Sequence, residues 1–348
     1  MHPNISCTLL LTLGLGTTIT FASSHWFLAW MGLEINTLAI LPLMAQYHHP
    51  RATEATLKYF LTQATAASTL LFATTTNAWL TGQWDIQHMT HPLPITLFTL
   101  ALALKIGLAP LHAWLPEVLQ GLDLGTGLVL TTWQKLAPFA LLLQIHPANS
   151  TLLIILGLTS TLIGGWGGLN QTQLRKLLAY SSIAHLGWMI LVLQFSPALT
   201  LLTLLMYFIM TFSTFLMFYL SNATNINTLA TSWTKAPALT ALAPLILLSL
   251  GGLPPLSGFM PKWLILQELT KQDLALTATL AALTALLSLY FYLRLSYAMA
   301  LTMFPNNPTS TPPWRFQSSQ IMYPLAISTT ATLMLLPLTP TIVALLTL

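Results

Sequence analysis

The chain is a succession of apolar runs of about 20 residues, separated by short polar stretches. A helix needs about 20 predominantly apolar residues to cross the hydrocarbon core of a bilayer. The pattern therefore predicts an all-α polytopic membrane protein with about eleven transmembrane helices. The predicted spans are residues 3–21, 24–46, 55–80, 95–115, 124–146, 150–168, 174–194, 198–221, 238–271, 274–303 and 322–345. Because the loops between them are short, we expect a single transmembrane domain over residues 1–348.

The composition agrees with this class of protein. Of 348 residues, 11 are Lys or Arg and 7 are Asp or Glu, so 5% are charged, against about 25% in soluble domains. A mean hydropathy of +0.73 excludes intrinsic disorder. The single cysteine, Cys7, excludes a disulfide scaffold, a Cys-ligated zinc site and an iron–sulfur cluster held by this chain alone.

Several ligands and partners are not expected. The formal charge of +4 is too sparsely distributed to indicate binding of nucleic acid. No phosphate-binding loop or dinucleotide fingerprint is present, so we do not expect the chain itself to bind ATP or NADH. The N-terminus has no Arg-rich targeting segment, which is typical of a bacterial or organelle-encoded membrane protein.

The basic residues of the loops are distributed unequally between the two sides of the membrane. The side of the N-terminus has seven of them, and the opposite side has only Lys271. The seven are Arg51, Lys58, Arg175, Lys176, Lys235, Arg294 and Arg315. Loops on the cytoplasmic or matrix side collect basic residues, so the N-terminus is predicted to lie there. Eleven spans then place the C-terminus on the other side; a miscounted span is the alternative.

Four acidic or basic residues lie deep inside predicted spans, away from their ends: Glu34, Lys105, Lys135 and Lys262. A lysine at mid-membrane costs roughly 2.5–3.5 kcal/mol when nothing compensates its charge. At 1.5 Å per residue, all four lie about 13–16 Å below a membrane surface, near the middle of a core about 30 Å thick. We expect a polar row that runs across the membrane domain. The alternative is that some of these side chains reach an interface or form a buried structural pair.

Two spans are expected to be discontinuous helices. Residues 107–116 and 252–261 are identical at five of ten positions, with Pro110 and Pro255 in register. Proline removes a backbone donor, so each segment should interrupt its helix. The two segments are the fourth and ninth spans, so the copies run in opposite directions. This predicts an inverted five-helix repeat, roughly 1–146 and 150–303, plus a C-terminal helix at 322–345; ordinary proline kinks are the alternative.

Two histidines are further candidates for proton transfer. His112 follows the first break, and His185 lies in an apolar helix after two serines. A histidine titrates near neutral pH and can relay protons. The alternative for each is a hydrogen bond to a freed carbonyl or hydroxyl group. Because only these two histidines are deeply placed, we do not expect a haem.

Five segments of the sequence resemble a known family. They are residues 31–36, 54–60, 105–118, 179–185 and 251–259. These segments closely resemble the antiporter-like membrane subunits of respiratory complex I, the mitochondrial NADH:ubiquinone oxidoreductase. Such subunits usually have fourteen helices; this chain lacks the first three, as an animal mitochondrial form does.

The resemblance implies a core subunit of the proton-pumping membrane arm, in the mitochondrial inner membrane. In that membrane, the asymmetry of basic residues predicts the N-terminus in the matrix and the C-terminus in the intermembrane space. The resemblance implies that Glu34, Lys105, Lys135 and Lys262 relay protons. It also implies that this chain holds no cofactor, and that other subunits bind NADH, FMN, iron–sulfur clusters and ubiquinone. The expected partners are other membrane-arm subunits and membrane lipid, with no nucleic acid.

The equal calculated depth of Glu34 and Lys105 predicts that they pair across neighbouring helices. Lys105 would hold its proton while Glu34 is close and charged, Lys135 would receive that proton through water, and Lys262 would pass it on. Two other functions are alternatives. A stand-alone cation/proton antiporter usually has an intramembrane Asp, which the middle of the predicted spans lacks. A purely structural scaffold does not need four ionisable residues at mid-membrane.

Overall fold

The computed structural model describes six stretches of the chain. They are residues 3–46, 49–89, 91–145, 150–234, 237–301 and 322–347. Lys235, Arg315 and Leu348, on which part of the predicted orientation depends, lie outside the described residues. Within them, every regular element is a helix, as the sequence predicts.

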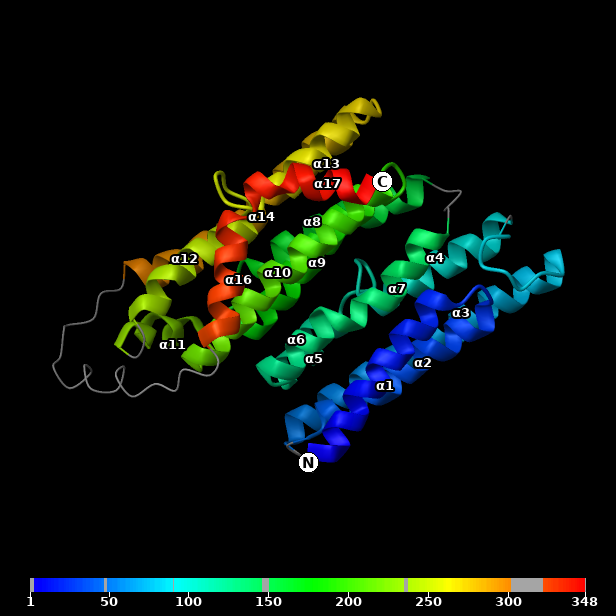
Figure 1. Cartoon of the computed structure of the whole chain (residues 1–348), viewed down its shortest axis with the longest axis horizontal. Coiled ribbons are helices and arrows are strands. Elements are labelled where there is room, and N and C mark those ends of the chain that lie inside the picture. Colours follow the sequence, from blue (N-terminus) through cyan, green and yellow to red (C-terminus); the bar gives the residue numbers. More distant parts are fainter. Residues whose placement is uncertain are drawn as a thin grey trace. The chain divides into compact units, whose positions relative to one another are not determined.

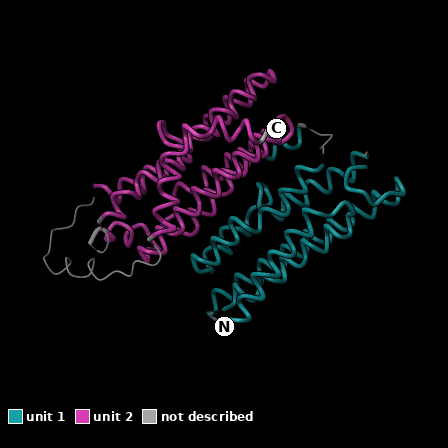
Figure 2. Tube along the Cα trace, in the orientation of Figure 1, with its two compact units in different colours: residues 1–156 teal, residues 157–348 magenta. Residues whose placement is uncertain are grey.

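The chain divides into two compact units, residues 1–156 and 157–348, with the border inside α8 (Figure 2). Unit 1 contains α1 (Pro3–Ala22), α2 (Trp26–Met44), α3 (Pro50–Thr81), α4 (Pro92–Ile106), α5 (Trp114–Gly121), α6 (Leu124–Thr131), α7 (Trp133–Gln144) and the start of α8 (Ser150–Gly168). Unit 2 contains the rest of α8, then α9 (Leu174–Leu193), α10 (Pro197–Ser221), α11 (Ile226–Ala230), α12 (Pro237–Gly251), α13 (Phe259–Lys271), α14 (Ala275–Ala300), α16 (Met322–Met334) and α17 (Thr339–Thr347).

Each predicted span falls on one helix or on an interrupted helix (Figure 1). Six helices are long and apolar enough to cross a membrane singly: α1, α2, α8, α9, α10 and α14. The two expected discontinuous helices are present, because residues 107–113 separate α4 from α5 and residues 252–258 separate α12 from α13. The count of about eleven membrane crossings stays a prediction.

Three boundaries differ from the sequence-based expectation. The fourth span was expected to end at residue 115, but a second helix, α5, begins at Trp114 and continues to Gly121. The fifth is interrupted at Thr132, between α6 and α7. The C-terminal helix expected at 322–345 is bent by 66° between α16 and α17. Pro110 and Pro337 lie at the first and third of these interruptions and remove a backbone donor from the helix ladder, whereas Pro138 lies inside α7 and does not explain the interruption at Thr132.

The threonines of α3 bond to the helix that carries them. Every threonine hydroxyl in this helix donates to a backbone carbonyl three or four residues earlier, at 2.7–3.1 Å. Inside a membrane such a bond satisfies the hydroxyl without water. The threonines of α3 therefore do not indicate that this helix has a polar surface.

Glycines allow α1 and α2 to pack closely. A Cβ atom on Gly16 would lie 2.3 Å from the Asn36 side-chain oxygen, and one on Gly32 would lie 2.6 Å from Thr20. Small residues at helix contacts permit such close approach in membranes. In unit 2, a Cβ atom on Gly164 of α8 would lie 2.6 Å from the Ala184 amide of α9. The contact of Gly164 with Ala184 corresponds to the contact of Gly16 with Asn36, because both positions are shifted by 148 residues.

A second feature repeats between the units. In unit 1, His25 and Asp85 form an antiparallel bridge that ties the loop before α2 to the loop after α3. In unit 2, Gln173 and Asn225 form the same bridge, between the loop before α9 and the loop after α10. Each bridge has two backbone hydrogen bonds of 3.0–3.2 Å. From His25 to Gln173 the shift is again 148 positions, so α1–α2 and α8–α9 are corresponding helix pairs.

The broken helices correspond as well. Gly107 and Leu108 both donate to the carbonyl of Ala103, and the amides 145 positions further on, at residues 252 and 253, both donate to the carbonyl of Leu248. Gly107 and Gly252 have φ angles of 87° and 79°, which a side chain would make unfavourable. This supports the repeat inferred from the sequence. The opposite direction of the two copies stays a prediction.

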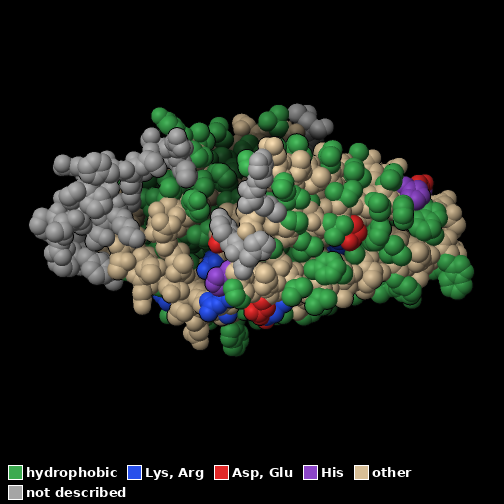
Figure 3. Space-filling view, turned by 90° about the horizontal axis from the view of Figure 1, so that it is seen from below, with side chains coloured by type: hydrophobic (Ala, Val, Ile, Leu, Met, Phe, Trp, Pro, Cys, Tyr) green, Lys and Arg blue, Asp and Glu red, His purple; other side chains and the backbone are tan. Residues whose placement is uncertain are grey.

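Apolar side chains cover much of the surface, and charged ones are few on the face in Figure 3. On α1 and α14, for example, Leu11 and Leu283 are 63% and 62% exposed. Exposed apolar surface on this scale suits lipid or the surfaces of other membrane subunits. The surface is therefore that of a membrane protein.

Candidate functional site

The break between α4 and α5 leaves backbone carbonyl groups that side chains satisfy. Pro110 has no amide hydrogen, so the helix does not continue through it. The Trp114 indole donates to the Leu104 carbonyl at 3.1 Å. The Gln63 side-chain amide of α3 donates to the Lys105 carbonyl at 3.4 Å. The break is therefore held open by polar contacts within unit 1.

Lys105 and Glu34 form a largely buried ion pair. The Lys105 ammonium, in the last turn of α4, lies 3.5 Å from a Glu34 carboxylate oxygen, in the middle of α2. The side chains are 3% and 25% exposed. The pairing predicted from their depth is confirmed. The attraction between the two charges offsets the free energy that is lost when they are removed from water. Removal of one partner leaves the other charge buried without that compensation.

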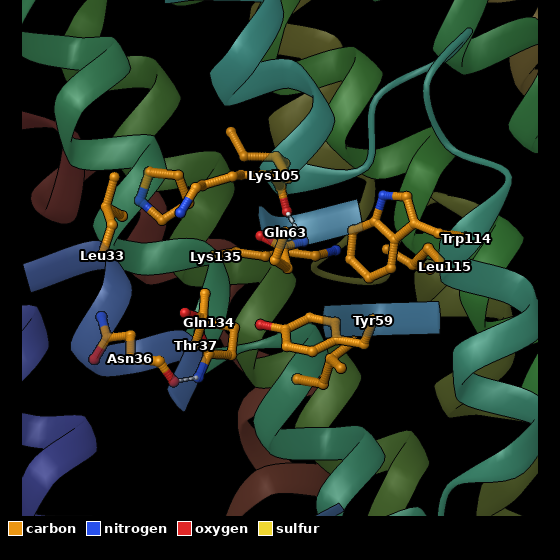
Figure 4. A pocket seen from close by; sticks show the side chains of 13 residues that line it. Leu33, Asn36, Thr37, Tyr59, Gln63, Lys105, Trp114, Leu115, Gln134 and Lys135 are labelled. Atoms are coloured by element: carbon orange, nitrogen blue, oxygen red, sulfur yellow. Dashed lines mark hydrogen bonds between the residues drawn. The ribbon is translucent and has the colours of Figure 1, made fainter. Parts of the chain in front are cut away.

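Lys135 and Lys105 line the same cavity (Figure 4). Lys135 is 3% exposed and lies in the first turn of α7, directly after the interruption at Thr132. The space open to the centre of a water-sized sphere is ≈ 20 Å³, and about 10–15 Å³ of such space suffices for one water molecule. Tyr59, Gln63 and Gln134 contribute polar atoms to its wall. The cavity can therefore hold water between the two lysines.

Sequence reasoning did not single out these three polar residues. Tyr59 and Gln63 lie on α3, four residues apart and so on one face, which was the available signal. Gln134 directly precedes Lys135, and its side-chain amide donates to the Asn36 carbonyl at 3.2 Å. Without knowledge of which helix faces which, isolated polar residues in apolar helices did not indicate a shared cavity.

Lys262 has a different kind of partner. Its ammonium donates to the carbonyl of Gly251, the last residue of α12, at 2.7 Å. The C-terminal end of a helix is partially negative and attracts a cation. A Cβ atom on Gly252 would lie 2.9 Å from the Lys262 nitrogen, so the glycine makes room for the lysine. Lys262 and its acceptor both belong to unit 2, whereas the Glu34–Lys105 pair and Lys135 belong to unit 1.

The two histidines occupy different settings. His112 lies in the break between α4 and α5 and bonds to the backbone of Pro110, which is the structural alternative considered for it. It is not among the residues that line the cavity of Lys105 and Lys135. His185, on α9 in unit 2, has its ring centroid 5.7 Å from that of Tyr207. The relay role of both histidines stays a prediction.

A metal site is not supported by the described part of the chain. Within it, no three His, Cys, Asp or Glu side chains gather closely enough to hold a metal ion. The polar groups that do gather are lysines, a carboxylate, amides and hydroxyls. Of these, the lysines and the carboxylate are groups that can bind and release protons.

Comparison with known proteins gives the family. Residues 23–288 match the family described as NADH:quinone oxidoreductase/Mrp antiporter, transmembrane region, and residues 289–343 match NADH dehydrogenase subunit 2, C-terminus. NADH-ubiquinone oxidoreductase chain 2 of Tetraodon nigroviridis is 74% identical over 345 residues, covering 99% of each chain. The chain belongs to the NADH-ubiquinone oxidoreductase chain 2 family. The same protein of Salmo salar is 70% identical over the whole length of both chains.

A solved structure agrees with this chain 2 assignment. A chain of respiratory complex I from Thermus thermophilus superposes with a TM-score of 0.86 at 30% sequence identity, covering 98% of this chain and 79% of that one. The family resemblance read from the sequence is confirmed. As a chain 2 protein, this chain is a membrane-arm subunit of complex I.

Proposed function

We propose that this chain carries protons across the mitochondrial inner membrane, with Glu34, Lys105 and Lys135 as the relay in unit 1 and Lys262 in unit 2. The observation that carries the proposal is the largely buried Glu34–Lys105 pair, whose lysine lines the same cavity as Lys135. A subunit of a proton-translocating complex needs groups that bind protons at mid-membrane, and these are such groups.

The geometry suggests how the relay works. While Glu34 is charged and close, it favours the protonated form of Lys105. When a neighbouring subunit weakens that pairing, Lys105 releases its proton to water in the cavity, and Lys135 takes it up. The transfer moves one positive charge from Lys105 to Lys135 and leaves the cavity water unchanged. Lys262 acts at its own break, where the Gly251 carbonyl holds its ammonium.

The orientation follows from the basic residues. Of the seven assigned to the N-terminal side, Arg51, Lys58, Arg175, Lys176 and Arg294 lie within the described residues. Basic loops face the matrix in this membrane. The N-terminus is then on the matrix side and the C-terminus on the intermembrane-space side.

The redox chemistry belongs to other subunits in this proposal. NADH, FMN, the iron–sulfur clusters and ubiquinone bind elsewhere in the complex, and electron transfer acts on this chain through a neighbour. Its partners are other membrane-arm subunits and lipid, which suit the exposed apolar surfaces of α1 and α14.

A second candidate is a stand-alone cation/proton antiporter, because the matched family description also names the Mrp antiporter. The full-length similarity to chain 2 proteins favours the complex-bound subunit. Purification in mild detergent separates the two: an antiporter is recovered as an active single chain, and a complex I subunit only with its partners.

The test of the relay is Glu34→Gln in the assembled complex. Glutamine keeps the size of the side chain and removes the charge that holds the proton on Lys105. We expect an assembled complex with reduced proton pumping and slowed NADH oxidation. The matched control is Glu54→Gln, because the Glu54 side chain is 62% exposed. Normal pumping and turnover in an assembled Glu34→Gln complex would leave Glu34 as a structural partner.

A further inference from the structure

Two tyrosines in unit 2 are buried in the membrane domain. Tyr207 of α10 and Tyr292 of α14 are each 1% exposed. Tyrosine in membrane helices is usually found at the interface, where its hydroxyl reaches water. Tyr290 and Tyr297, on the same helix as Tyr292, follow that rule and are 59% and 58% exposed. The two buried hydroxyls therefore need an explanation inside the protein.

Both hydroxyls meet the same short stretch of α9. The Tyr207 hydroxyl bonds to Ser182, and the Tyr292 hydroxyl faces Ser181. Tyr207 and Tyr292 are also close enough to each other to interact electrostatically. One turn further along α9, the ring of His185 lies beside that of Tyr207, with centroids 5.7 Å apart. Four hydroxyls and an imidazole thus form one polar cluster in an otherwise apolar helix bundle.

The serines act as acceptors in this cluster. The Ser181 and Ser182 hydroxyls donate to backbone carbonyls of their own helix, at 2.7 and 2.8 Å. Their oxygens are then available to accept from the tyrosines. The Tyr292 oxygen closes no hydrogen bond of standard geometry within the described residues. A poorly satisfied buried hydroxyl is costly in a membrane, so a water molecule is the expected partner of the Tyr292 hydroxyl beside Ser181.

Lys262 is related to Tyr292 through Gly251. A Cβ atom built on Gly251 would be 3.8 Å from the Tyr292 ring, and the Gly251 carbonyl accepts the hydrogen bond from the Lys262 ammonium. Gly251 is therefore the neighbour of both side chains.

The internal repeat gives independent support. The shift of 148 positions that relates α1–α2 to α8–α9 places Ser182 at the position of Glu34. In unit 1, this position on the second helix of the unit holds the carboxylate of the buried ion pair. In unit 2, the corresponding position belongs to the hydroxyl cluster.

We propose that Tyr207 and Tyr292 conduct protons between His185 and Lys262 in unit 2. The inference rests on the proposed proton-carrying function. A proton that arrives on one hydroxyl oxygen is matched by release of the proton which that oxygen held, so each tyrosine is neutral before and after. A water molecule beside the Tyr292 oxygen completes the link to the Lys262 amine, which takes up or supplies the proton at its end.

The experiment compares Tyr207→Phe and Tyr292→Phe in the assembled complex, in sealed mitochondrial membrane vesicles. Phenylalanine keeps the ring and its packing and removes only the hydroxyl. We expect proton-coupled NADH oxidation to fall roughly tenfold, below the ~10²–10⁴-fold of a direct acid–base contact, because water partly replaces a hydroxyl. The solvent deuterium isotope effect on turnover should rise, because proton transfer becomes rate-limiting; a merely structural role would not change it.

Matched controls lie on the same helices. Tyr290→Phe on α14 and Tyr219→Phe on α10 remove hydroxyls from side chains that are 59% and 50% exposed, and both should behave as wild type. Wild-type turnover, pumping and isotope effect in assembled Tyr207→Phe and Tyr292→Phe complexes would overturn the proposal. Failure of both variants to assemble would assign the hydroxyls a structural role and overturn it as well.

The experiment distinguishes failure of the tyrosine proposal from failure of the Glu34–Lys105–Lys135 relay. If Glu34→Gln slows pumping while both tyrosine variants are normal, the relay stands and the tyrosine link is wrong. If Glu34→Gln is also normal, the proposed function itself is wrong.

Discussion

The Lys262 ammonium bonds to the Gly251 carbonyl at 2.7 Å, whereas the Lys105 ammonium faces the Glu34 carboxylate at 3.5 Å. The two lysines thus differ in how the bond to the acceptor can be weakened. A carboxylate can lose its charge by taking up a proton, but a backbone carbonyl cannot. The bond of Lys262 therefore weakens through loss of the lysine's own proton or through movement at the break between α12 and α13, and not through a change of charge on its acceptor.

Gly252→Ala should disturb that lysine. The added Cβ atom would lie 2.8 Å from the Lys262 side chain, in a backbone conformation with φ = 79°. Left-handed backbone alone costs an L-residue about 1–2 kcal/mol. The matched control is Gly82→Ala, where φ is 73° but nothing lies within 4 Å of the added atom. We expect slower turnover and lower thermal stability of the complex for Gly252→Ala, and the stability loss alone for Gly82→Ala. Equal activity in both variants would show that the position of Lys262 does not matter.

Lys105→Met and Lys135→Met should each depress proton pumping in the assembled complex. Methionine is unbranched and of similar length to lysine, but it lacks the nitrogen that binds a proton. Lys271→Met is the control, because the Lys271 side chain is 61% exposed and pairs with Glu268 at the end of α13. Lys58→Met should also act much less, because Lys58 is 42% exposed. Pumping measured as protons per NADH oxidised checks this, and a Lys135→Met complex with a normal ratio would remove Lys135 from the relay.

The Glu34–Lys105 pair should show coupling in a double-variant cycle. Removing one partner of a buried pair typically costs about 3–5 kcal/mol, and the partial exposure of Glu34 places this pair toward the low end. Glu34→Gln with Lys105→Met should therefore be more stable than Lys105→Met alone, because no unpaired carboxylate remains. Thermal disassembly of the three variant complexes measures this; additive losses would mean that the 3.5 Å contact contributes nothing to stability.

The orientation is open to a direct test. We expect the loop between α8 and α9, before Arg175 and Lys176, to face the matrix. Protease added outside sealed mitoplasts should leave this loop intact and should cut it once the membrane is opened. Cleavage in sealed mitoplasts would show that the number of spans before α9 is not six.

The sequence predicted the features that depend on position along one helix. Runs of apolar residues predicted the helices, and Gly107 with Pro110 predicted where a helix breaks. Counting residues from the membrane surface placed Glu34 and Lys105 at one depth, and the structure pairs them. The depth of a residue in the membrane depends only on its distance along the helix, so it can be predicted from the sequence.

Features that depend on which way a side chain points were missed. Helices that are apolar on every face give no signal of which face is buried. The sequence therefore gives no sign that Tyr207 and Tyr292 are buried, although each is 1% exposed. The partner of Lys262 was also invisible, because every residue has a backbone carbonyl and the sequence does not mark the one at Gly251.

The self-bonded threonines of α3 bear on how this helix enters the membrane. Each threonine brings its own acceptor within the helix, so it can face lipid tails much as a valine does. Hydropathy scales count the hydroxyl as a penalty that the folded helix does not incur. The insertion machinery therefore meets a segment that is more hydrophobic than its composition suggests.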